Sequence, residues 1–380
     1  MDRVFCERKA GIREELMLDK KKPLKVVKVI GIVLLVLGAV VIAFGLKTWK
    51  DAGEFKTLDY HSDLNCKAVG GVESSEDITI DPETGMAFIS SVARGLDRDK
   101  SEPAHGAIFG YDLKSGNPQL VNLTPGIDKK LDGGFFPHGI ALYIADDGAG
   151  SLFVINHRTN GDFVEIFDYK DGALKHRRSV SGDLMHNPND LLAVGPDTFY
   201  VGNDHGARTF NGQILEDFLK LPKAYVLFFD GKQFRTVAEG LRYTNGFAMD
   251  RDGKTLYVGE TTGRSVRTYE RDPKTNGLKL KDILDLDTGV DNLEMDADGN
   301  IWVGAHPRLM TFIKHAKDVS KPSPSQIIKL TPKQGGGFDV KDVHLEDGIQ
   351  LPASSVAAPY KNKVLIGLVF APKFGVCEIK

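Results

Sequence analysis

Residues 291–305, DNLEMDADGNIWVGA, decide the fold of this chain, because their pattern occurs six times. A polar pair is followed by a strand in which apolar and polar residues alternate, then by a turn and a second apolar strand. This period of two, with the hairpin turns DPETG, DRDG and DADG, predicts antiparallel strands and argues against helical repeats. The other copies are EDITIDPETGMAFIS from residue 76, HGIALYIADDGAGSLFVIN from 138, NDLLAVGPDTFYVGN from 189, NGFAMDRDGKTLYVGE from 245 and SSVAAPYKNKVLIGL from 354.

The spacing of the copies indicates the architecture. They start 62, 51, 56, 46 and 63 residues apart, which suits the four-stranded blades of a β-propeller. Six copies therefore predict an all-β fold, a six-bladed β-propeller over residues 66–380. Because the last copy begins at Ser354, close to the C-terminus, an N-terminal strand must complete the last blade.

The N-terminal region differs from the rest in being strongly apolar. Val29 to Leu46 is a run of 18 uncharged residues, and as a helix it would span about 27 Å, close to the thickness of a membrane's hydrocarbon core. Nine Lys and Arg residues precede the run and three follow it closely. The positive-inside rule then predicts a cytoplasmic N-terminus and an extracellular, lumenal or periplasmic propeller. A cleaved signal peptide is the alternative, although its leading segment would be long and no clear cleavage site follows.

The chain is thus predicted to have four segments. They are a cytoplasmic basic leader over residues 1–28, a transmembrane signal-anchor helix over 29–46, a linker over 47–65 and the propeller over 66–380. The 49 Lys and Arg residues balance 52 Asp and Glu residues, which argues against nucleic acid as a partner.

Three cysteines agree with this topology. Cys6 would lie alone in the cytoplasm, whereas Cys66 and Cys377 lie at the two ends of the globular part. In an oxidising compartment Cys66 and Cys377 can pair, which would staple the closure of the last blade. Two free cysteines are the alternative.

The polar pairs fall at equivalent positions of the six copies. In a propeller the innermost strand of each blade lines the central tunnel, so these residues, although far apart in sequence, should form one ring. The expected ring consists of Glu76, His138, Asn189, Asn245, Asp291 with Asn292, and Ser354.

The ring offers mainly carboxylate and amide oxygens, which are the ligands that Ca²⁺ prefers, whereas Zn²⁺ would require His and Cys. Asp77 and Asp190, the second members of two pairs, should point to the opposite face of their strands and could hold a second ion deeper in the tunnel. A backbone carbonyl near Ile140 would assist them. The alternative is that these Asp and Asn residues only cap strands and turns.

His138 is the expected proton-transfer residue, because a histidine beside a metal can act as a general base near neutral pH. His157 ends the next strand of the same blade and could orient His138. The alternative is a purely structural histidine pair. Asp204 and His205 end the second strand of the third copy, near the tunnel mouth, and are predicted to support the site from behind.

At these residues the chain resembles the paraoxonase/arylesterase family of calcium-dependent lactonases, over nearly all of residues 60–380. The resemblance is carried by SSEDITI (74–80), FFPHGIAL (135–142), VINH (154–157), NPNDLLAVGPDTFYVGNDH (187–205), VAEGLRYTNGFAMDRDGKTLYV (237–258), VDNLEMDADGNIWVGAHP (290–307) and SSVAAPYKNKVLIGLVF (354–370). One segment, residues 206–224, departs from the family's pattern. It is shorter than the helix that covers the family's active site, and its composition is different.

The resemblance implies two calcium ions and a role for each residue of the ring. The catalytic calcium would be held by the positions that match Glu76, Asn189, Asn245, Asp291 and Asn292. The structural calcium would be held by Asp77, Asp190 and the carbonyl of Ile140. His138 and His157 match the family's histidine dyad, and Cys66 and Cys377 match its disulfide.

The activity expected from this resemblance is calcium-dependent hydrolysis of lactones and aryl esters by His138-activated water. A sugar-lactone hydrolase of the gluconolactonase type is a second hypothesis, and a non-catalytic, calcium-stabilised binding propeller is a third. A substrate panel separates the first two, and loss of all turnover would favour the third.

Overall fold

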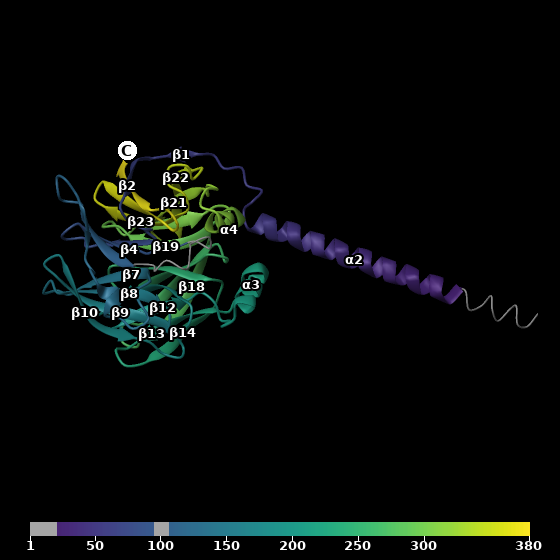
Figure 1. Cartoon of the computed structure of the whole chain (residues 1–380), viewed down its shortest axis with the longest axis horizontal. Coiled ribbons are helices and arrows are strands. Elements are labelled where there is room, and N and C mark those ends of the chain that lie inside the picture. Colours follow the sequence, from purple (N-terminus) through teal and green to yellow (C-terminus); the bar gives the residue numbers. More distant parts are fainter. Residues whose placement is uncertain (1–20, 95–105) are drawn as a thin grey trace, which may run out of the picture. The chain divides into compact units, whose positions relative to one another are not determined.

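The computed structural model describes residues 21–94 and 106–380, with side chains from residue 27 onward (Figure 1). The chain divides into two compact units, residues 1–51 and 52–380. Cys6 and most of the predicted basic leader lie outside the described residues.

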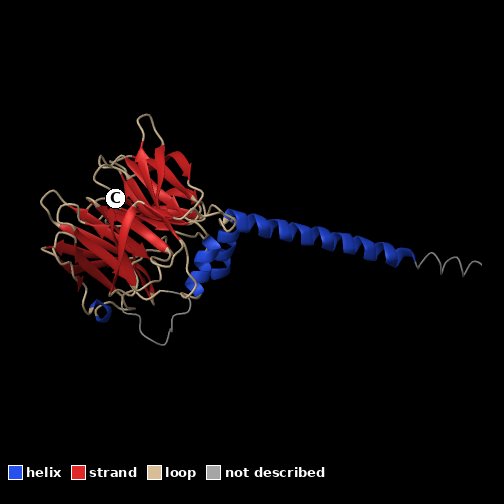
Figure 2. Cartoon of the chain, turned by 90° about the horizontal axis from the view of Figure 1, so that it is seen from above, coloured by secondary structure: helices blue, strands red, loops and turns tan. Residues whose placement is uncertain are grey.

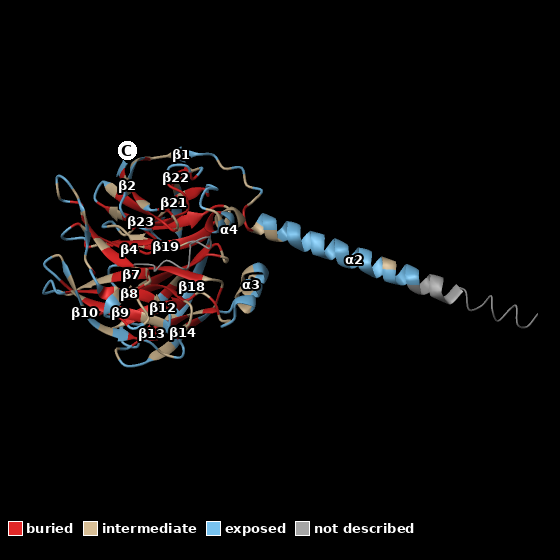
Figure 3. Ribbon diagram, viewed as in Figure 1, coloured by how far each residue is buried: buried red, intermediate tan, exposed pale blue. Residues whose placement is uncertain are grey.

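The described part of the first unit is one helix, α2 (Lys21–Asp51). From Val27 onward it is long and apolar enough to cross a membrane. Its apolar side chains are exposed (Figure 3); Leu35, for example, is 75% exposed. The predicted apolar helix is therefore present, and it extends beyond residues 29–46 at both ends.

The described residues of the second unit form six antiparallel sheets, with strands making up most of the domain (Figure 2). The innermost strands of the six sheets contact one another in chain order, and the last of them contacts the first, so the ring is closed. The six-bladed β-propeller predicted from the repeats is confirmed.

Each blade consists of consecutive strands, except where the N-terminal segment joins. Blades 1 to 3 are β3 (Asp77–Ile80), β4 (Met86–Ser91), β5 (Ala107–Asp112), β6 (Leu120–Asn122); β7 (Pro137–Ile144), β8 (Gly150–Arg158), β9 (Gly161–Lys170), β10 (Ala173–Val180); and β11 (Pro188–Ala193), β12 (Phe199–Asn203), β13 (Ala224–Phe229), β14 (Phe234–Leu241). Blades 4 to 6 are β15 (Thr244–Met249), β16 (Thr255–Glu260), β17 (Ser265–Arg271), β18 (Leu278–Asp285); β19 (Gly289–Met295), β20 (Ile301–His306), β21 (Ser325–Pro332), β22 (Phe338–Glu346); and β23 (Ser354–Tyr360), β24 (Lys363–Leu368), β25 (Lys373–Ile379) with β2 (Leu64–Gly70). Within the described residues, this unit has the helical segments η1 (Ile127–Lys129), α3 (Phe210–Leu219) and α4 (Leu309–Lys317).

Strand β2 closes the propeller, as the position of the last repeat required. It pairs antiparallel with β25, and Cys66 lies directly opposite Cys377. The two cysteines form a disulfide across this pair, 311 residues apart in sequence. A shorter strand, β1 (His61–Ser62), adds to the outer edge of blade 5, so strand pairing begins before residue 66.

The segment just before these strands is bound to the propeller as well. The N–H of Leu309 donates to the carbonyl of Ala52 at 2.9 Å, and the N–H of Thr311 donates to Glu54 at 2.9 Å. Glu54 therefore satisfies an N–H in the first turn of α4, where helices lack internal partners.

Apolar side chains fill the spaces between neighbouring blades. One cluster joins blades 2 and 3 through Phe153, Ile155 and Phe199, each 0% exposed. Equivalent clusters lie between the other neighbouring pairs. The apolar halves of the alternating strands thus face adjacent blades, which leaves the polar pairs at the tunnel ends of the inner strands.

These polar pairs lie in β-bulges. In blades 2 to 5 two residues of the inner strand oppose one residue of the second strand, as at Asp291 and Asn292, between the paired residues Val290 and Leu293. A bulge redirects side chains, so the strict alternation assumed from the sequence does not apply to these pairs.

Glycines opposite the bulges allow the blades to approach one another closely. A Cβ at Gly304 would lie 2.1 Å from the carbonyl oxygen of Ser355, and one at Gly367 would lie 2.1 Å from that of Ser75. The small residue in WVGA and LIGL therefore permits the backbone contacts that bring the ring residues together.

Candidate active site

Four of the predicted ring residues, Glu76, Asn245, Asp291 and Asn292, lie close together near the start of the inner strands. The side-chain amide of Asn292 donates to the backbone oxygen of Glu76 at 3.1 Å and to its Oε1 at 3.2 Å. The amide of Asn245 donates to Oδ1 of Asp291 at 2.7 Å. Ser355 donates to the carbonyl of Glu76 at 2.6 Å. Residues from blades 1, 4, 5 and 6 are therefore in direct contact.

The member of blade 6 that reaches the ring differs from the one expected. Ser354 exchanges hydrogen bonds with the backbone of Gln326 in β21, whereas Ser355 contacts Glu76. The register of β23 shifts between Ser354 and Val356, and this irregularity turns Ser355 toward the tunnel.

Several oxygens of these side chains are buried without a hydrogen-bond partner among the described residues. Leaving a buried acceptor unsatisfied costs about 1–3 kcal/mol, so a group of them requires another partner. These atoms are Oε2 of Glu76, the Oδ1 atoms of Asn189, Asn245 and Asn292, and Oδ1 of Asp190.

The donor set suits a hard cation. It supplies carboxylate and amide oxygens, as calcium sites do. Within the described residues, no three His, Cys, Asp or Glu side chains cluster closely enough to hold a metal ion by themselves. Amide oxygens of Asn189, Asn245 and Asn292 would therefore have to complete a shell around Glu76 and Asp291.

Asp77 and Asp190 accept hydrogen bonds from backbone N–H groups, whereas the ring residues bond to one another. Oδ2 of Asp77 accepts from the N–H of Ile140 at 2.6 Å, and Oδ2 of Asp190 accepts from the N–H of Phe247 at 3.1 Å. The contact with Ile140 thus uses its amide N–H, and the role of its carbonyl stays a prediction. Each carboxylate bridges from its own blade to the next.

Burial and neighbouring charges alter the acidity of the tunnel carboxylates. Burial, with the charges of nearby acidic groups, raises the pKa of both Asp77 and Asp190 well above the usual value. Burial also raises the pKa of Glu294, three residues after Asp291, to about 8. Burial acts to raise the pKa of Glu76 too, but His138 and Arg94 outweigh it and lower the pKa. A cation among these groups would offset their mutual repulsion.

The two predicted histidines are hydrogen bonded to each other. Nδ1 of His138 lies 2.8 Å from Nε2 of His157, and Nε2 of His138 lies 3.5 Å from Oε1 of Glu76. Burial lowers the pKa of His138 to about 4, which leaves its imidazole neutral at pH 7. Nδ1 of His157 lies 2.8 Å from Oδ1 of Asp162.

Asp204 and His205 join the ring region to α3. Nδ1 of His205 lies 2.7 Å from Asp204, and its Nε2 lies 3.1 Å from Asp217 in α3. The ring of His205 contacts Tyr243, with centroids 5.0 Å apart, two residues before Asn245. The pair therefore anchors α3, which lies within the segment 206–224 that differs from the family's pattern.

Four residues of the site were missed at the level of sequence. Arg94 donates to the carbonyl of Pro137 at 2.6 Å and lies near Glu76. Nε2 of His306 lies 2.7 Å from Oδ2 of Asp291. Only His306 had a usable signal, because it ends the second strand of its copy as His157 does. Arg94, Asp162 and Glu294 are outside the repeated pairs.

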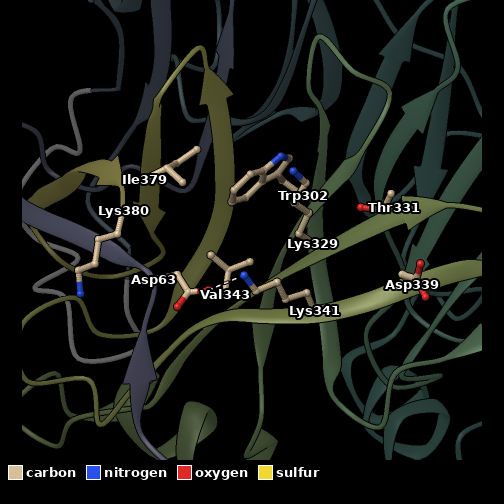
Figure 4. Close-up of a pocket in the computed structure, with 9 residues that line it drawn as sticks. All are labelled: Asp63, Trp302, Lys329, Thr331, Asp339, Lys341, Val343, Ile379 and Lys380. Atoms are coloured by element: carbon tan, nitrogen blue, oxygen red, sulfur yellow. Dashed lines mark ion pairs between the residues drawn. The ribbon is translucent and has the colours of Figure 1, made fainter.

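A separate groove of about 340 Å³ lies between the outer strands of blades 5 and 6 (Figure 4). Two of its lysines have acidic partners: Lys341 lies 2.7 Å from Asp63, and Lys329 lies 3.7 Å from Asp296. None of the ring residues lines this groove, whose lining is Asp63, Trp302, Lys329, Thr331, Asp339, Lys341, Val343, Ile379 and Lys380.

Comparison with known proteins gives the family of the chain. The model of the arylesterase family matches residues 57–379. Serum paraoxonase/arylesterase 2 of Gallus gallus is 36% identical over 313 residues, which cover 80% of this chain and 86% of the relative. Serum paraoxonase/arylesterase 1 of Homo sapiens is 35% identical over 320 residues, covering 83% and 89%.

Solved structures share the architecture at low identity. A luciferin-regenerating enzyme has a TM-score of 0.53 and 13% identity, covering 83% of this chain and 95% of its own. A gluconolactonase from Xanthomonas campestris has a TM-score of 0.50 and 16% identity, covering 84% and 91%. These likenesses support the fold alone, whereas the match over residues 57–379 and the identity to curated relatives place the chain in the arylesterase family.

Proposed function

We propose that this chain hydrolyses lactones and aryl esters at the ring end of the tunnel, with His138 as the general base and calcium as the cofactor. The observation that carries the proposal is a group of buried oxygens on Glu76, Asn189, Asn245 and Asn292 that have no hydrogen-bond partner among the described residues. Glu76 also faces the His138–His157 pair. Family membership supports the same activity, because the relatives are named as arylesterases and paraoxonases.

Two shells of ligands would hold the ions. Glu76, Asn189, Asn245, Asp291 and Asn292 would supply the upper shell, and Asp77, Asp190 and the carbonyl of Ile140 the lower one. A Ca²⁺ ion in the upper shell would polarise an ester carbonyl and stabilise the negative charge that develops on its oxygen.

His138 would act on the water. Its Nε2 is on the side of the ring that faces Glu76, so it can accept a proton from a water molecule in the site. The water oxygen then bonds to the carbonyl carbon, and the bond from that carbon to the alcohol oxygen breaks. The proton on His138 passes to the departing alkoxide, which restores the neutral imidazole.

The proposal extends to location. The helix α2 would anchor the protein with its N-terminus in the cytoplasm, and the propeller would lie in an oxidising compartment. The disulfide between Cys66 and Cys377 supports that side of the membrane, because such bonds persist mainly outside the cytosol.

The test is a substrate panel on the full chain in detergent. Phenyl acetate, a long-chain δ-lactone and gluconolactone would each be measured with calcium and with excess EGTA. We expect turnover of the first two with calcium only, and loss of about 10²–10⁴-fold in the His138→Gln variant.

The exposed His61→Gln variant is the matched control and should keep full activity. Turnover of gluconolactone alone would assign the chain to the sugar-lactone class instead. No turnover of any member of the panel, in a folded and calcium-loaded protein, would overturn the proposal.

A further inference from the structure

We propose that Asp162 is a positioning residue that sets the direction of the hydrogen bonds through His157 and His138, and so keeps a lone pair on Nε2 of His138. This inference rests on the proposed function of His138 as the base. It assigns a role to a residue outside the six polar pairs.

Asp162 is held opposite His157 by a hairpin. The strands β8 and β9 are joined by the short loop at Thr159 and Asn160, and His157 pairs directly with Asp162 in the register of these strands. Cross-strand neighbours of this kind are close enough for their side chains to bond, and Oδ1 of Asp162 lies 2.8 Å from Nδ1 of His157.

The second oxygen of Asp162 is also engaged. Oδ2 accepts from the backbone N–H of Asn187 at 3.1 Å. Burial acts to raise the pKa of Asp162, but the hydrogen bond and charge of His157, with the N–H of Asn187, outweigh it and lower the pKa. The side chain is therefore an ionised acceptor with both oxygens in fixed directions.

An ionised carboxylate can only accept hydrogen bonds. Nδ1 of His157 must therefore carry the proton that Asp162 accepts. In the proposed order this is the only proton on the His157 ring, so its Nε2 accepts in turn. The donor to that Nε2 is Nδ1 of His138, 2.8 Å away. Nε2 of a neutral His138 is then left without a proton, although Oε1 of Glu76, 3.5 Å away, is itself an acceptor that would favour one. The two carboxylates therefore compete for the order of the protons, and the proposal is that Asp162, 2.8 Å from His157, prevails.

The same arrangement of protons also suits the state in which His138 is protonated and positively charged. When His138 takes a proton from water, its Nδ1–H still donates to His157, and Nδ1–H of His157 still donates to Asp162. No rotation of either ring is needed, and the carboxylate favours the positive charge through the intervening imidazole. Asp162 touches no reacting atom, so it acts only through His157.

A purely structural role is the competing explanation, because Asp162 also joins the hairpin of blade 2 to Asn187 before blade 3. The two roles differ in the ranking of variants. Asp162→Asn keeps the shape, but its Oδ1 must still accept from Asn187, which turns its amide N–H₂ toward His157. That would reverse the direction of both hydrogen bonds, the one to His157 and the one from His157 to His138, and would place a hydrogen on Nε2 of His138. Asp162→Ala loses both hydrogen bonds of the carboxylate, but it does not force the hydrogen bond between His157 and His138 into either direction.

The experiment compares these variants as full chains with calcium, using phenyl acetate. We expect kcat to fall about 10²–10³-fold in Asp162→Asn, with KM within about threefold, and to fall less in Asp162→Ala. Asp168→Asn, on the same strand but paired with Arg177 at the surface, is the control and should keep full activity. Unfolding midpoints should rank the other way, with Asp162→Ala the less stable of the two. Equal activity of Asp162→Asn and wild type, or activity that simply follows stability, would overturn the inference.

A second readout does not depend on turnover. In ¹⁵N spectra of the imidazoles, the wild type should carry protons on Nδ1 of both His138 and His157, and Asp162→Asn should carry them on Nε2. Protons on Nε2 in the wild type would refute the role of Asp162 even if the enzyme is active. If the ¹⁵N spectra show the expected protons but the protein hydrolyses no substrate of the panel, the proposed function is wrong and the role of Asp162 in ordering the hydrogen bonds stands.

Discussion

Asn292 and Glu76 are 216 residues apart, yet the side-chain amide of Asn292 donates to Oε1 of Glu76 at 3.2 Å. Glu76 directly precedes β3 in blade 1, and Asn292 lies in β19 of blade 5. Their contact therefore exists only when the ring is closed, and the site reports on the integrity of the whole propeller.

Calcium removal should affect stability as well as activity. The ring gathers buried carboxylates with oxygens that have no partner among the described residues, so a bound cation stabilises the folded state. At about 100 times its Kd, an ion contributes about 2.7 kcal/mol. We expect excess EGTA to abolish esterase activity and to lower Tm by several degrees in thermal unfolding. Restoration by Ca²⁺ and not by Mg²⁺ is the control, and an unchanged Tm would contradict a ligand role for the ring.

The effect of Asp190→Asn on the free energy of unfolding should have opposite signs with and without calcium. Burial and nearby acidic charges raise the pKa of Asp190, so the ionised carboxylate is unfavourable without a cation. In EGTA the variant should be about 1–2 kcal/mol more stable than the wild type, and in calcium less stable by a similar amount. Urea unfolding in the two conditions measures this, with the exposed Glu378→Gln as the control. Destabilisation of equal size in both conditions would exclude the lower calcium site at Asp190.

His205 should contribute stability that disappears at high pH. Burial acts to lower its pKa, but the hydrogen bonds and charges of Asp204 and Asp217 raise it to about 10, above the ordinary 6.5. A raised histidine pKa stabilises the folded state fully below about pH 6.5, and the contribution is lost as pH rises through 10. Relative to His205→Gln, the wild type should be on the order of 2 kcal/mol more stable at pH 6.5.

That advantage of the wild type over His205→Gln should shrink toward zero by pH 10.5, as measured by urea unfolding. A second variant, Asp217→Asn, removes only the partner in α3 and should give a smaller, similarly directed change. A difference that stays constant from pH 6.5 to 10.5 would mean that His205 is neutral in the folded protein.

The disulfide should dominate the stability of the closure. Cys66 and Cys377 are 311 residues apart, and in the chain-entropy model a loop of that size corresponds to about 6 kcal/mol. We expect Cys377→Ala to lower the free energy of unfolding by several kcal/mol and to make β2 the first strand to exchange its amide protons. Hydrogen exchange checks this, and uniform exchange across all six blades would contradict it.

The N-terminal helix should decide membrane association. The apolar side chains of α2 are exposed from Val27 onward. We expect the full chain to stay with membranes in alkaline carbonate, and a chain that begins at Ala52 to be released as an active enzyme. Replacing Leu34 and Leu35 with Lys should also release it, whereas replacing both with Ile should not. Carbonate extraction of the full chain would indicate a peripheral protein.

The sequence determined the parts of this protein that repeat. A period of two in six copies predicts six blades, and the polar residue that opens each copy identifies the tunnel ends of the inner strands. The disposition of Cys66 and Cys377 at the ends of the propeller, and of His138 and His157 in one blade, followed from the same pattern and from the family resemblance. These features are local or periodic, so the chain displays them without its fold.

Only the tertiary structure decided the contacts between copies. Ser355 rather than Ser354 reaches Glu76 because the register of β23 shifts next to it, and a single-residue shift of that kind leaves no trace in an alternating pattern. Arg94 and Asp162 belong to no repeated pair. The packing of blade 1 against blade 2 brings Arg94 to the carbonyl of Pro137, and the pairing of β8 with β9 brings Asp162 to His157. The physical reason is that pleat alternation fixes which residues face inward, whereas bulges and blade-to-blade packing fix which of those inward groups meet.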